Sequence, residues 1–280
     1  MRHNRLRELL DNDQPSLGTR IISSWPTIIE LIGHSGMFDY VEFSGEYGPY
    51  DHATLENMGR GIELFDHLTG MIKIEQESRT HAAVRAIGAG FQSVLFADPR
   101  SVEEVQQCIR GVRSERPQSD GLHGVNMHRS VGVVLEPGTE AWADAMDEVV
   151  IAIMIEKKGA IENLEAILDI PGVDMVQFGP ADYSNSLGLT GQMQHPQVIE
   201  AHKYMIETAL NKGVAPRVEL NVPEGFEPYL EMGVKHFNVG VDLKTLFTWY
   251  TEAGGAARTV LGLEPLHEGL SSRIQSTYGK

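Results

Sequence analysis

Cysteine is almost missing from this sequence of 280 residues, which contains only Cys108. A single cysteine excludes an internal disulfide bond and a cluster of thiolate metal ligands, and it favours a cytoplasmic location. Cys108 lies in a helical stretch, where we expect an ordinary helix residue without chemistry. Long apolar runs are also missing, because none approaches the roughly 20 apolar residues of a membrane span. Residues 1–16 carry basic side chains but no apolar segment, so they do not resemble a secretory signal.

Positive charge is scarce. There are 23 Lys and Arg residues against 39 Asp and Glu residues, which gives a formal net charge of −16. Such an acidic surface repels phosphate groups, so nucleic acid and anionic membranes are poor partners. Hydrophobic residues make up 41% of the chain and charged residues 22%, which is the composition of an ordinary globular protein with its own core.

Several signatures of familiar enzyme sites are missing. Without HExxH or CxxC, a zinc hydrolase lacks its usual ligands. The patterns GxxxxGK[ST] and GxSxG are absent too, which excludes a P-loop and a serine nucleophile elbow. The glycines of residues 86–91 end a predicted helix before a strand, which is the wrong order for a dinucleotide-binding loop.

Short apolar segments alternate with segments of helical period. The predicted strands are 17–23, 40–45, 71–75, 93–97, 149–156, 174–179, 214–220 and 236–242. The predicted helices that follow them are 27–36, 53–67, 78–87, 101–113, 163–168, 196–211, 224–232 and 243–257. This order predicts an α/β fold, a (β/α)8 TIM barrel, with a doubly wound open sheet as the alternative. No change in composition separates two domains, so residues 1–280 are predicted to form one domain.

Two segments depart from this rhythm. Residues 114–148 form a long insertion between the fourth and fifth strands, with an acidic helical piece at 140–149. Long loops in a compact domain are often functional. The tail from about residue 256 has helix formers but weak periodicity, and we expect it to pack on a neighbouring subunit or to be mobile.

The active site of a TIM barrel lies at the carboxyl ends of its strands. The polar residues at these ends are Arg20, Glu42, Ser44, Glu46, Lys73, Glu75, Glu156, Lys157, Lys158, Asp182, Arg217, Glu219 and Asp242. Glu156 ends an almost wholly apolar strand, and Asp182 follows the next strand. Two carboxylates with room for water suit an ion such as Mg²⁺. Alternatively, Glu156 forms a salt bridge with Lys73, Lys157 or Lys158, and Asp182 caps a helix.

Of the 11 histidines, only His52, His123 and His128 fall in predicted loops. The other histidines are expected at ordinary helix or surface positions. These three are the ones considered as candidates for proton transfer.

Residues 154–188, MIEKKGAIENLEAILDIPGVDMVQFGPADYSNSLG, resemble the HpcH/HpaI family of class II pyruvate-dependent aldolases. This family includes 4-hydroxy-2-oxoheptanedioate aldolase and 2-dehydro-3-deoxyglucarate aldolase. The similar features are the strand-end Glu, the ENL helix, PGVD and the GPAD loop, followed by HPQV at 195–198. Residues 38–51 resemble the family's FD…DGEH-x-P stretch, and weaker similarity covers residues 17–252.

The resemblance implies roles for several residues. Glu156 and Asp182 match the family's ligands for Mg²⁺, Mn²⁺ or Co²⁺, which chelates the oxygens of a 2-oxo acid. The backbone around Gly179, Pro180 and Ala181 matches the loop that binds the substrate carboxylate. A divalent cation in this place polarises the ketone and stabilises the enolate formed when a carbon–carbon bond breaks.

Three positions depart from the family. The family's Asp-Gly-Glu-His becomes Ser44-Gly45-Glu46-Tyr47, so the acid/base pair of Asp and His is missing. Lys73 takes the place of an Arg that contacts the keto oxygen, which keeps the charge but loses the two-pronged guanidinium. Lys73 and Tyr47 are therefore the candidate catalytic residues. We expect Lys73 and the metal to lower the pKa of Tyr47.

The sequence therefore predicts a metal-dependent carbon–carbon lyase that cleaves a 4-hydroxy-2-oxo acid through a pyruvate-like enolate. One alternative is a decarboxylase or a condensing enzyme that uses oxaloacetate. Another is a protein that binds metal and 2-oxo acid without catalysis. By the same resemblance the chain is expected to form homo-oligomers, as a hexamer or trimer of dimers. The aromatic segment 246–250 would lie at a subunit contact or in the core.

Overall fold

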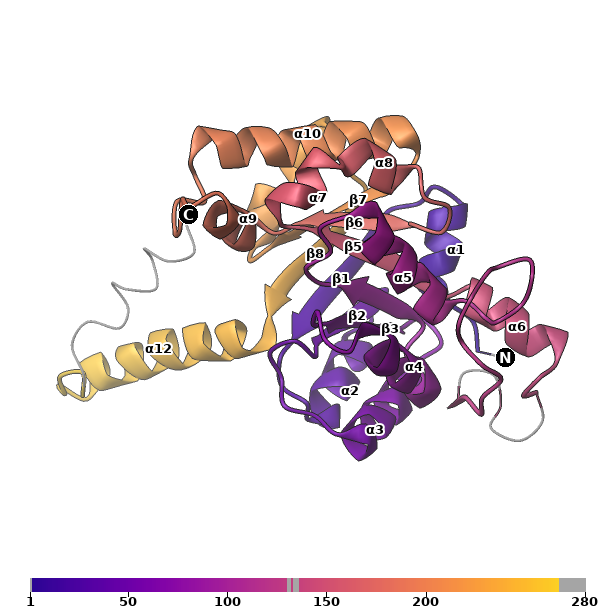
Figure 1. Cartoon of the computed structure of the whole chain (residues 1–280). Helices are drawn as coiled ribbons and strands as arrows, with labels where there is room; N and C mark the ends of the chain where they lie inside the picture. The colour runs from indigo at the N-terminus through magenta and orange to yellow at the C-terminus, as the bar shows by residue number, and fades with distance from the viewer. Residues whose placement is uncertain (1, 130–131, 133–135, 267–280) are drawn as a thin grey trace.

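Eight parallel strands close into a barrel in the computed structural model, which describes residues 2–129, 132 and 136–266 (Figure 1). Each strand pairs with the next in sequence, and β1 pairs with β8 to close the ring. The strands are β1 (Ser16–Ile21), β2 (Tyr40–Ser44), β3 (Thr69–Ile74), β4 (Ser93–Phe96), β5 (Val150–Ile155), β6 (Met175–Phe178), β7 (Ala215–Leu220) and β8 (His236–Val241). The predicted (β/α)8 barrel is confirmed, and all eight predicted strands are present.

Helices follow every strand and surround the barrel. They are α2 (Pro26–Ser35), α3 (His52–Glu63), α4 (Arg79–Ala89), α5 (Val102–Val112), α6 (Glu140–Asp147), α7 (Lys158–Glu162), α8 (Leu164–Leu168), α9 (Pro180–Ser186), α10 (Pro196–Lys212), η2 (Pro223–Gly225), α11 (Glu227–Glu231) and α12 (Asp242–Val260). The short α7 and α9 were not predicted, because each is a single turn or two at the start of a βα connection.

The core has two parts, because side chains alternate between the two faces of each strand. The larger part lies between the strands and the helices, where Phe43, Ile72, Phe96 and Ile153 are fully buried. The smaller part fills the barrel interior and contains Leu6, Tyr40, Met71, Leu95, Val150, Ala152, Met154 and Met175. Both parts are packed with apolar side chains, so the carboxyl ends of the strands are held on a rigid base.

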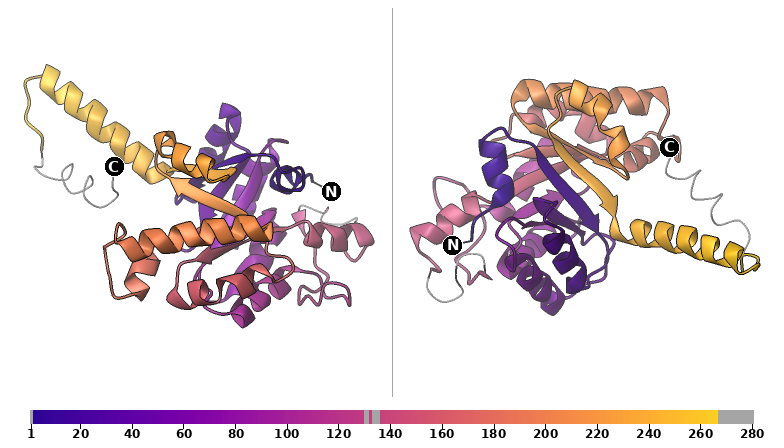
Figure 2. Two further views of the ribbon diagram at one scale, coloured as in Figure 1. Left: turned by 90° about the horizontal axis from the view of Figure 1, so that it is seen from above. Right: turned by 180° about the vertical axis from the view of Figure 1, so that it is seen from behind.

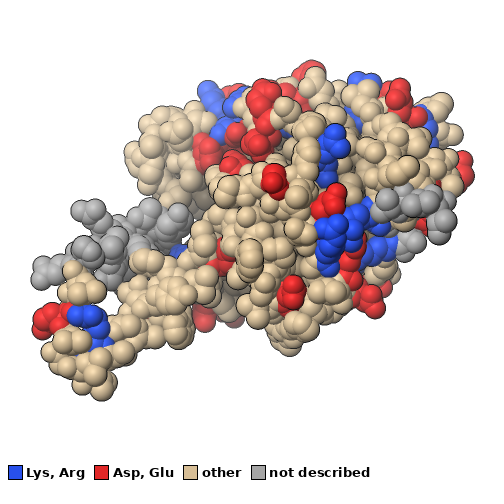
Figure 3. All heavy atoms as spheres, turned by 90° about the horizontal axis from the view of Figure 1, so that it is seen from below, with Lys and Arg blue, Asp and Glu red and all other residues tan. Residues whose placement is uncertain are grey.

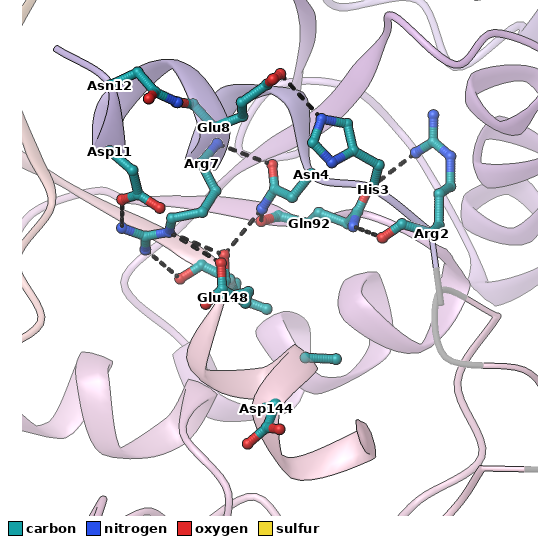
Figure 4. A pocket seen from close by; sticks show the side chains of 12 residues that line it. Arg2, His3, Asn4, Arg7, Glu8, Asp11, Asn12, Gln92, Asp144 and Glu148 are labelled. Carbon is teal, nitrogen blue, oxygen red and sulfur yellow. Dashed lines mark hydrogen bonds and ion pairs between the residues drawn. The ribbon is translucent and has the colours of Figure 1, made fainter. Parts of the chain in front are cut away.

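A helix that the sequence pattern did not predict closes the other end of the barrel. This helix, α1 (Arg5–Asp11), buries Leu6 and Leu9 against the strands. Asn4 caps it and donates hydrogen bonds to the carbonyl groups of Gln92 and Glu148. Figure 4 shows the cavity of about 640 Å³ beside α1, at the amino ends of the strands. Its side chains hold the N-terminal segment to the barrel.

The described residues of the insertion, 114–129, 132 and 136–148, include α6, which packs at the same end of the barrel. Its Trp142, on α6, is buried and stacks on His128 with an interplanar angle of 10°. The Nε2 atoms of His123 and His128 lie 3.0 Å apart, and both rings are buried. His128 also lies against Gly88, close to the carboxyl end of α4. This pair is therefore a structural feature, and His128 is not placed to exchange protons at the strand ends.

The last helix, α12, extends away from the barrel (Figure 2). It has no buried residue, and its exposed side chains include Leu243, Phe247, Trp249 and Tyr250. Figure 3 shows few charged side chains along its length. The aromatic segment 246–250 is thus outside the core of its own chain. The predicted tail is helical as far as Val260, and residues 267–280 lie outside the described residues. No described helix is both long and apolar enough to cross a membrane.

Candidate active site at the carboxyl ends of the strands

Lys73, at the end of β3, is a buried cation held by the turn that follows β2. Its ammonium lies 2.6 Å from Oε2 of Glu46 and 5.3 Å from the centre of the Tyr47 ring. The turn forms because the carbonyl of Ser44 accepts hydrogen bonds from the backbone of Tyr47 and Gly48. Burial lowers the pKa of Lys73, but the nearby acidic groups, led by Glu156, outweigh it and raise the pKa above its ordinary value. Lys73 therefore remains a cation.

Glu156 follows β5 as a buried carboxylate without an ion pair among the described residues. Only 2% of the residue is exposed, and Oε1 accepts a hydrogen bond of 3.0 Å from the backbone N–H of Asp98. Burial raises the pKa of Glu156 to about 7, although Lys73 acts in the opposite direction. The alternative of a structural salt bridge is wrong, because Lys73 pairs with Glu46, Lys157 with two aspartates and Lys158 with Glu162.

Gly179, directly after β6, leaves the space that this carboxylate occupies. A Cβ built on Gly179 would lie 2.6 Å from the Cβ of Glu156 and in collision with Oε2. Any other residue at position 179 would therefore displace the Glu156 side chain. The absence of a side chain at this position is therefore required for the observed position of Glu156.

Asp182 lies in the first turn of α9, next to β5 and β6. It does not cap the helix, because the N-cap is Gly179 and no side chain makes a capping hydrogen bond there. Its Oδ1 pairs with the ammonium of Lys157 at 2.7 Å, and the same ammonium lies 2.6 Å from Oδ1 of Asp98. Asp182 is close enough to Glu156 to contribute to the raised pKa of that carboxyl.

The ion pairs at the strand ends leave a surplus of negative charge. Four cations, Arg20, Lys73, Lys157 and Arg217, pair with five carboxylates, Glu42, Glu46, Asp98, Asp182 and Glu219. Glu156, Glu75 and Asp242 also lie at these strand ends and have no ion pair among the described residues, so carboxyl groups outnumber cations here. A divalent cation bound by Glu156 and Asp182 would offset part of this excess. No group of three or more His, Cys, Asp or Glu side chains within the described ranges could hold an ion alone. The two carboxylates therefore fit an ion that also takes oxygens from water and substrate, as Mg²⁺ does.

The start of α9 offers backbone donors beside these carboxylates. The first turn of a helix leaves its N–H groups without intrahelical partners, and here they belong to Ala181 and Asp182. Pro180, which has no N–H, occupies the first position. Gly179, Pro180 and Ala181 are all at least partly exposed, so a carboxylate can reach this turn.

Tyr47 lies over the ammonium of Lys73, in the turn after β2. Its side chain is on the surface of the mouth, with the residue 53% exposed. Burial of part of the ring, together with nearby acidic groups, raises the pKa of Tyr47 in spite of Lys73. Lys73 does act to lower this pKa, as expected, but burial and then the nearby carboxylates outweigh it, so without a bound metal the pKa is raised. Ser44 is fully buried, and its hydroxyl has no hydrogen-bond partner among the described residues.

A second layer of polar residues lies deeper in the barrel. The buried guanidinium of Arg217 binds the carboxylate of Glu42, the amide of Gln177 and the hydroxyl of Tyr40. Above it, Arg20 pairs with Glu219 at 3.0 Å. All four charged residues were considered for the site from the sequence, but they are paired with one another. Arg217 and Glu42 are fully buried and form part of the barrel interior.

The sequence pattern did not indicate a role for Asp98, and it placed His52 in a loop, whereas His52 is the first residue of α3. Asp98 follows β4, has a left-handed backbone with φ of 65°, and positions both Glu156 and Lys157. A non-glycine residue in this conformation is uncommon, but the sequence alone does not reveal it. His52 is exposed at the start of α3, and its ring lies 5.8 Å from that of His81.

Comparison with known proteins gives a consistent family match. The HpcH/HpaI aldolase/citrate lyase family model matches residues 26–248. A 4-hydroxy-2-oxo-heptane-1,7-dioate aldolase from Shigella boydii serotype 18 is 26% identical over 250 residues, covering 87% of this chain and 90% of that protein. A 5-keto-4-deoxy-D-glucarate aldolase from Klebsiella pneumoniae is 27% identical over 241 residues, covering 86% of this chain and 91% of that protein.

Solved structures share the fold over most of their length. An HpcH/HpaI aldolase/citrate lyase family protein from Burkholderia cenocepacia J2315 has a TM-score of 0.83 at 25% identity, over 91% of this chain and all of that chain. The citrate synthase SbnG has a TM-score of 0.80 at 21% identity, over 92% of this chain and 98% of that chain. The second likeness is one of fold alone.

Proposed function

We propose that this chain, which belongs to the HpcH/HpaI aldolase/citrate lyase family and is an enzyme of the lyase type, requires a divalent metal ion. We propose further that it cleaves a carbon–carbon bond of 4-hydroxy-2-oxo acids. The aldolases it resembles support the reaction type. Its single cysteine suits the cytoplasm, where we expect it to work.

One observation carries the proposal: among the described residues, Glu156 is a buried carboxylate without an ion pair, beside Asp182 and in a position that only glycine at 179 permits. A buried unpaired carboxylate destabilises a fold, so its presence favours a functional role. A divalent ion bound by Glu156 and Asp182 would polarise the ketone of the substrate and stabilise negative charge on its keto oxygen.

The reaction is a retro-aldol cleavage. The C4 hydroxyl passes its proton to solvent water as the C3–C4 bond breaks, and the C4 oxygen becomes the carbonyl of the released aldehyde. The bonding electron pair moves through C3 to the keto oxygen, which gives the enolate of pyruvate. Protonation of C3 then completes pyruvate.

Residues of this chain have distinct roles in the proposed reaction. The backbone N–H groups of Ala181 and Asp182 hold the substrate carboxylate, with Gly179 and Pro180 shaping the turn. Lys73 stabilises the negative charge that develops on the keto oxygen. Tyr47, whose raised pKa keeps its hydroxyl protonated at neutral pH, donates a proton or hydrogen bond to the substrate.

A pyruvate-release assay tests the proposal. Purified protein is supplied with Mg²⁺, Mn²⁺ or Co²⁺ and a panel of 4-hydroxy-2-oxo acids with different groups on C4. We expect pyruvate and the matching aldehyde in equal amounts, and none after treatment with EDTA. If no member of a broad panel is cleaved with any of the three ions, the proposed reaction is wrong.

A second candidate is a decarboxylase or condensing enzyme that uses oxaloacetate. The observation that favours it is the turn after β2, where Ser44 and Tyr47 stand in place of the family's acid/base pair. Consumption of oxaloacetate without release of an aldehyde would distinguish this reaction from aldol cleavage.

We also propose that α12 packs on a second copy of the chain. Its apolar side chains, including Leu243, Phe247 and Trp249, have no core to join in their own subunit. Exposed apolar surface of this kind marks an interaction site. Light scattering should report a homo-oligomer, and replacing Phe247 and Trp249 by Glu should dissociate it. A monomer in the unmodified protein would contradict this role of α12.

A further inference from the structure

A second cavity opens at the carboxyl ends of β6 and β7, beside the proposed site. It has a volume of about 620 Å³ and lies between these strands, the first half of α10 and α11. Its apolar lining includes Phe178, Val198, Ile199, Leu220 and Tyr229. The cavity is large enough for an aromatic ring or a short alkyl chain.

Aromatic rings form one wall of this cavity. The ring of His202 stacks on Phe178 at 4.7 Å with an interplanar angle of 10°, and it lies 5.5 Å from the ring of Tyr229. Burial lowers the pKa of His202 to about 4, so the imidazole is neutral at neutral pH. The wall therefore presents flat, uncharged surfaces to a ligand.

The charged groups around the cavity disfavour an anionic ligand. Its lining contains one cation, Arg217, whose guanidinium is already bound to Glu42 inside the barrel. It also contains two carboxylates, Glu219 and Glu224. Glu219 pairs with Arg20, whereas Glu224 has no ion pair among the described residues. A ligand that ends in a carboxylate would thus meet a net negative charge and no available cation.

Two residues connect the lining of the cavity with the proposed active site. Pro180, which lines it, begins α9 two residues before Asp182. Glu219 also lines it and forms its ion pair with Arg20 in the mouth of the barrel. A substrate whose carboxylate rests on the first turn of α9 can therefore extend its far end past Pro180 into the cavity.

We propose that this cavity binds the non-reacting end of the substrate, and that this end is an uncharged aromatic or alkyl group. This inference rests on the proposed function, because it concerns the group attached to C4 of the 2-oxo acid. It assigns a substrate class that differs from the dicarboxylic acid in the name of the similar heptanedioate aldolase. The specificity-determining residues are Phe178, Ile199, His202 and Tyr229.

Binding of two analogues without a C4 hydroxyl tests the inference without turnover. In calorimetry with Mn²⁺ present, 2-oxo-4-phenylbutanoate should bind at least about tenfold more tightly than 2-oxohexanedioate, which carries a carboxylate at its far end. The variant Ile199→Glu, at a half-exposed position of α10, should remove this preference. Leu210→Glu is the matched control, because Leu210 is exposed on the same helix but does not line the cavity.

Each result is decisive. Equal or tighter binding of the dicarboxylic analogue, or a preference that survives Ile199→Glu, would overturn the inference. A change in oligomer mass with Ile199→Glu, without a change in preference, would assign the cavity to a second copy of the chain and also overturn it. The predicted preference together with failure of the pyruvate-release assay would retain the cavity's role and reject the proposed reaction.

Discussion

The side chain of Glu156 occupies the space that a side chain at Gly179 would need: a Cβ atom on Gly179 would lie 2.6 Å from the Cβ of Glu156. The two residues follow neighbouring strands, β6 and β5. The carboxylate therefore keeps its position only because position 179 has no side chain. This relationship couples the shape of the loop after β6 to the proposed ion site.

The first prediction follows from this pair. Gly179→Ala should push the Glu156 side chain aside and lower Mn²⁺ affinity by at least about tenfold, although both carboxylates remain. Isothermal titration calorimetry measures the affinity. Gly124→Ala is the control, since a Cβ on Gly124 meets nothing within 4 Å. Equal affinity in Gly179→Ala and the unmodified protein would show that Glu156 does not bind the ion.

Lys73 is predicted to act on the reaction more than on stability. Lys73→Ala should lower turnover by about 10²-fold, because it removes the cation expected beside the developing oxyanion. Lys158→Ala, which breaks only an exposed pair with Glu162, serves as the control. Turnover and thermal unfolding are measured on the same samples. If the lost activity merely follows the lost folded fraction, Lys73 has a structural role with Glu46.

Tyr47 is predicted to donate a proton or hydrogen bond. Tyr47→Phe keeps the ring and should lower turnover by at least about tenfold, with the affinity for a 2-oxo acid retained. Since the pKa of Tyr47 is raised, its ionisation should not affect the pH profile below about pH 10. Full activity in Tyr47→Phe would show that the ring only forms a wall. In the converse experiment, Ser44→Asp with Tyr47→His should increase aldolase activity.

The buried pair of His123 and His128 is predicted to make the fold sensitive to acid. Burial lowers the pKa of both, that of His128 to about 4, from an ordinary value of 6.5. Below about pH 6.5 the unfolded chain therefore takes up protons that the folded chain does not. The free energy of unfolding should fall as the pH falls towards about 4, with a slope of up to about 1.4 kcal/mol per pH unit for each proton.

The variant His128→Gln tests this prediction. Its free energy of unfolding, measured by urea denaturation from pH 7.5 to pH 5, should depend less on pH than that of the unmodified chain. His52→Gln, at an exposed position of α3, should keep the original dependence. An unchanged slope in His128→Gln would show that the pair does not titrate on unfolding.

The barrel could be predicted from sequence because most strands, such as β5 and β6, are short apolar runs. The strand-end position of Glu156 followed directly, since an apolar run ending in a carboxylate is unusual. In contrast, α1 has seven residues and only two buried leucines, too few for a clear period. Its role depends on contacts with residues far along the chain, such as Gln92.

Details of the ion pairs could not be predicted, because they depend on which side chains meet across the barrel. Lys157 is next to Glu156 in sequence, yet its ammonium pairs with Asp98 and Asp182. The direction of the Tyr47 pKa shift also depends on this arrangement. Lys73 alone would lower that pKa, but burial and the surrounding carboxylates raise it.

The central claim is that Glu156 and Asp182 hold a divalent ion at which pyruvate forms its enolate. The most direct test is hydrogen exchange at the methyl group of pyruvate in D₂O, followed by mass spectrometry, because it requires no knowledge of the aldehyde. We predict that deuterium is incorporated with Mg²⁺, Mn²⁺ or Co²⁺ and that incorporation stops when EDTA is added. It should also stop in Glu156→Gln and in Asp182→Asn, since a neutral amide is a weaker ligand than a carboxylate. No exchange with any of the three ions, or exchange that persists with EDTA or in both variants, would contradict the account.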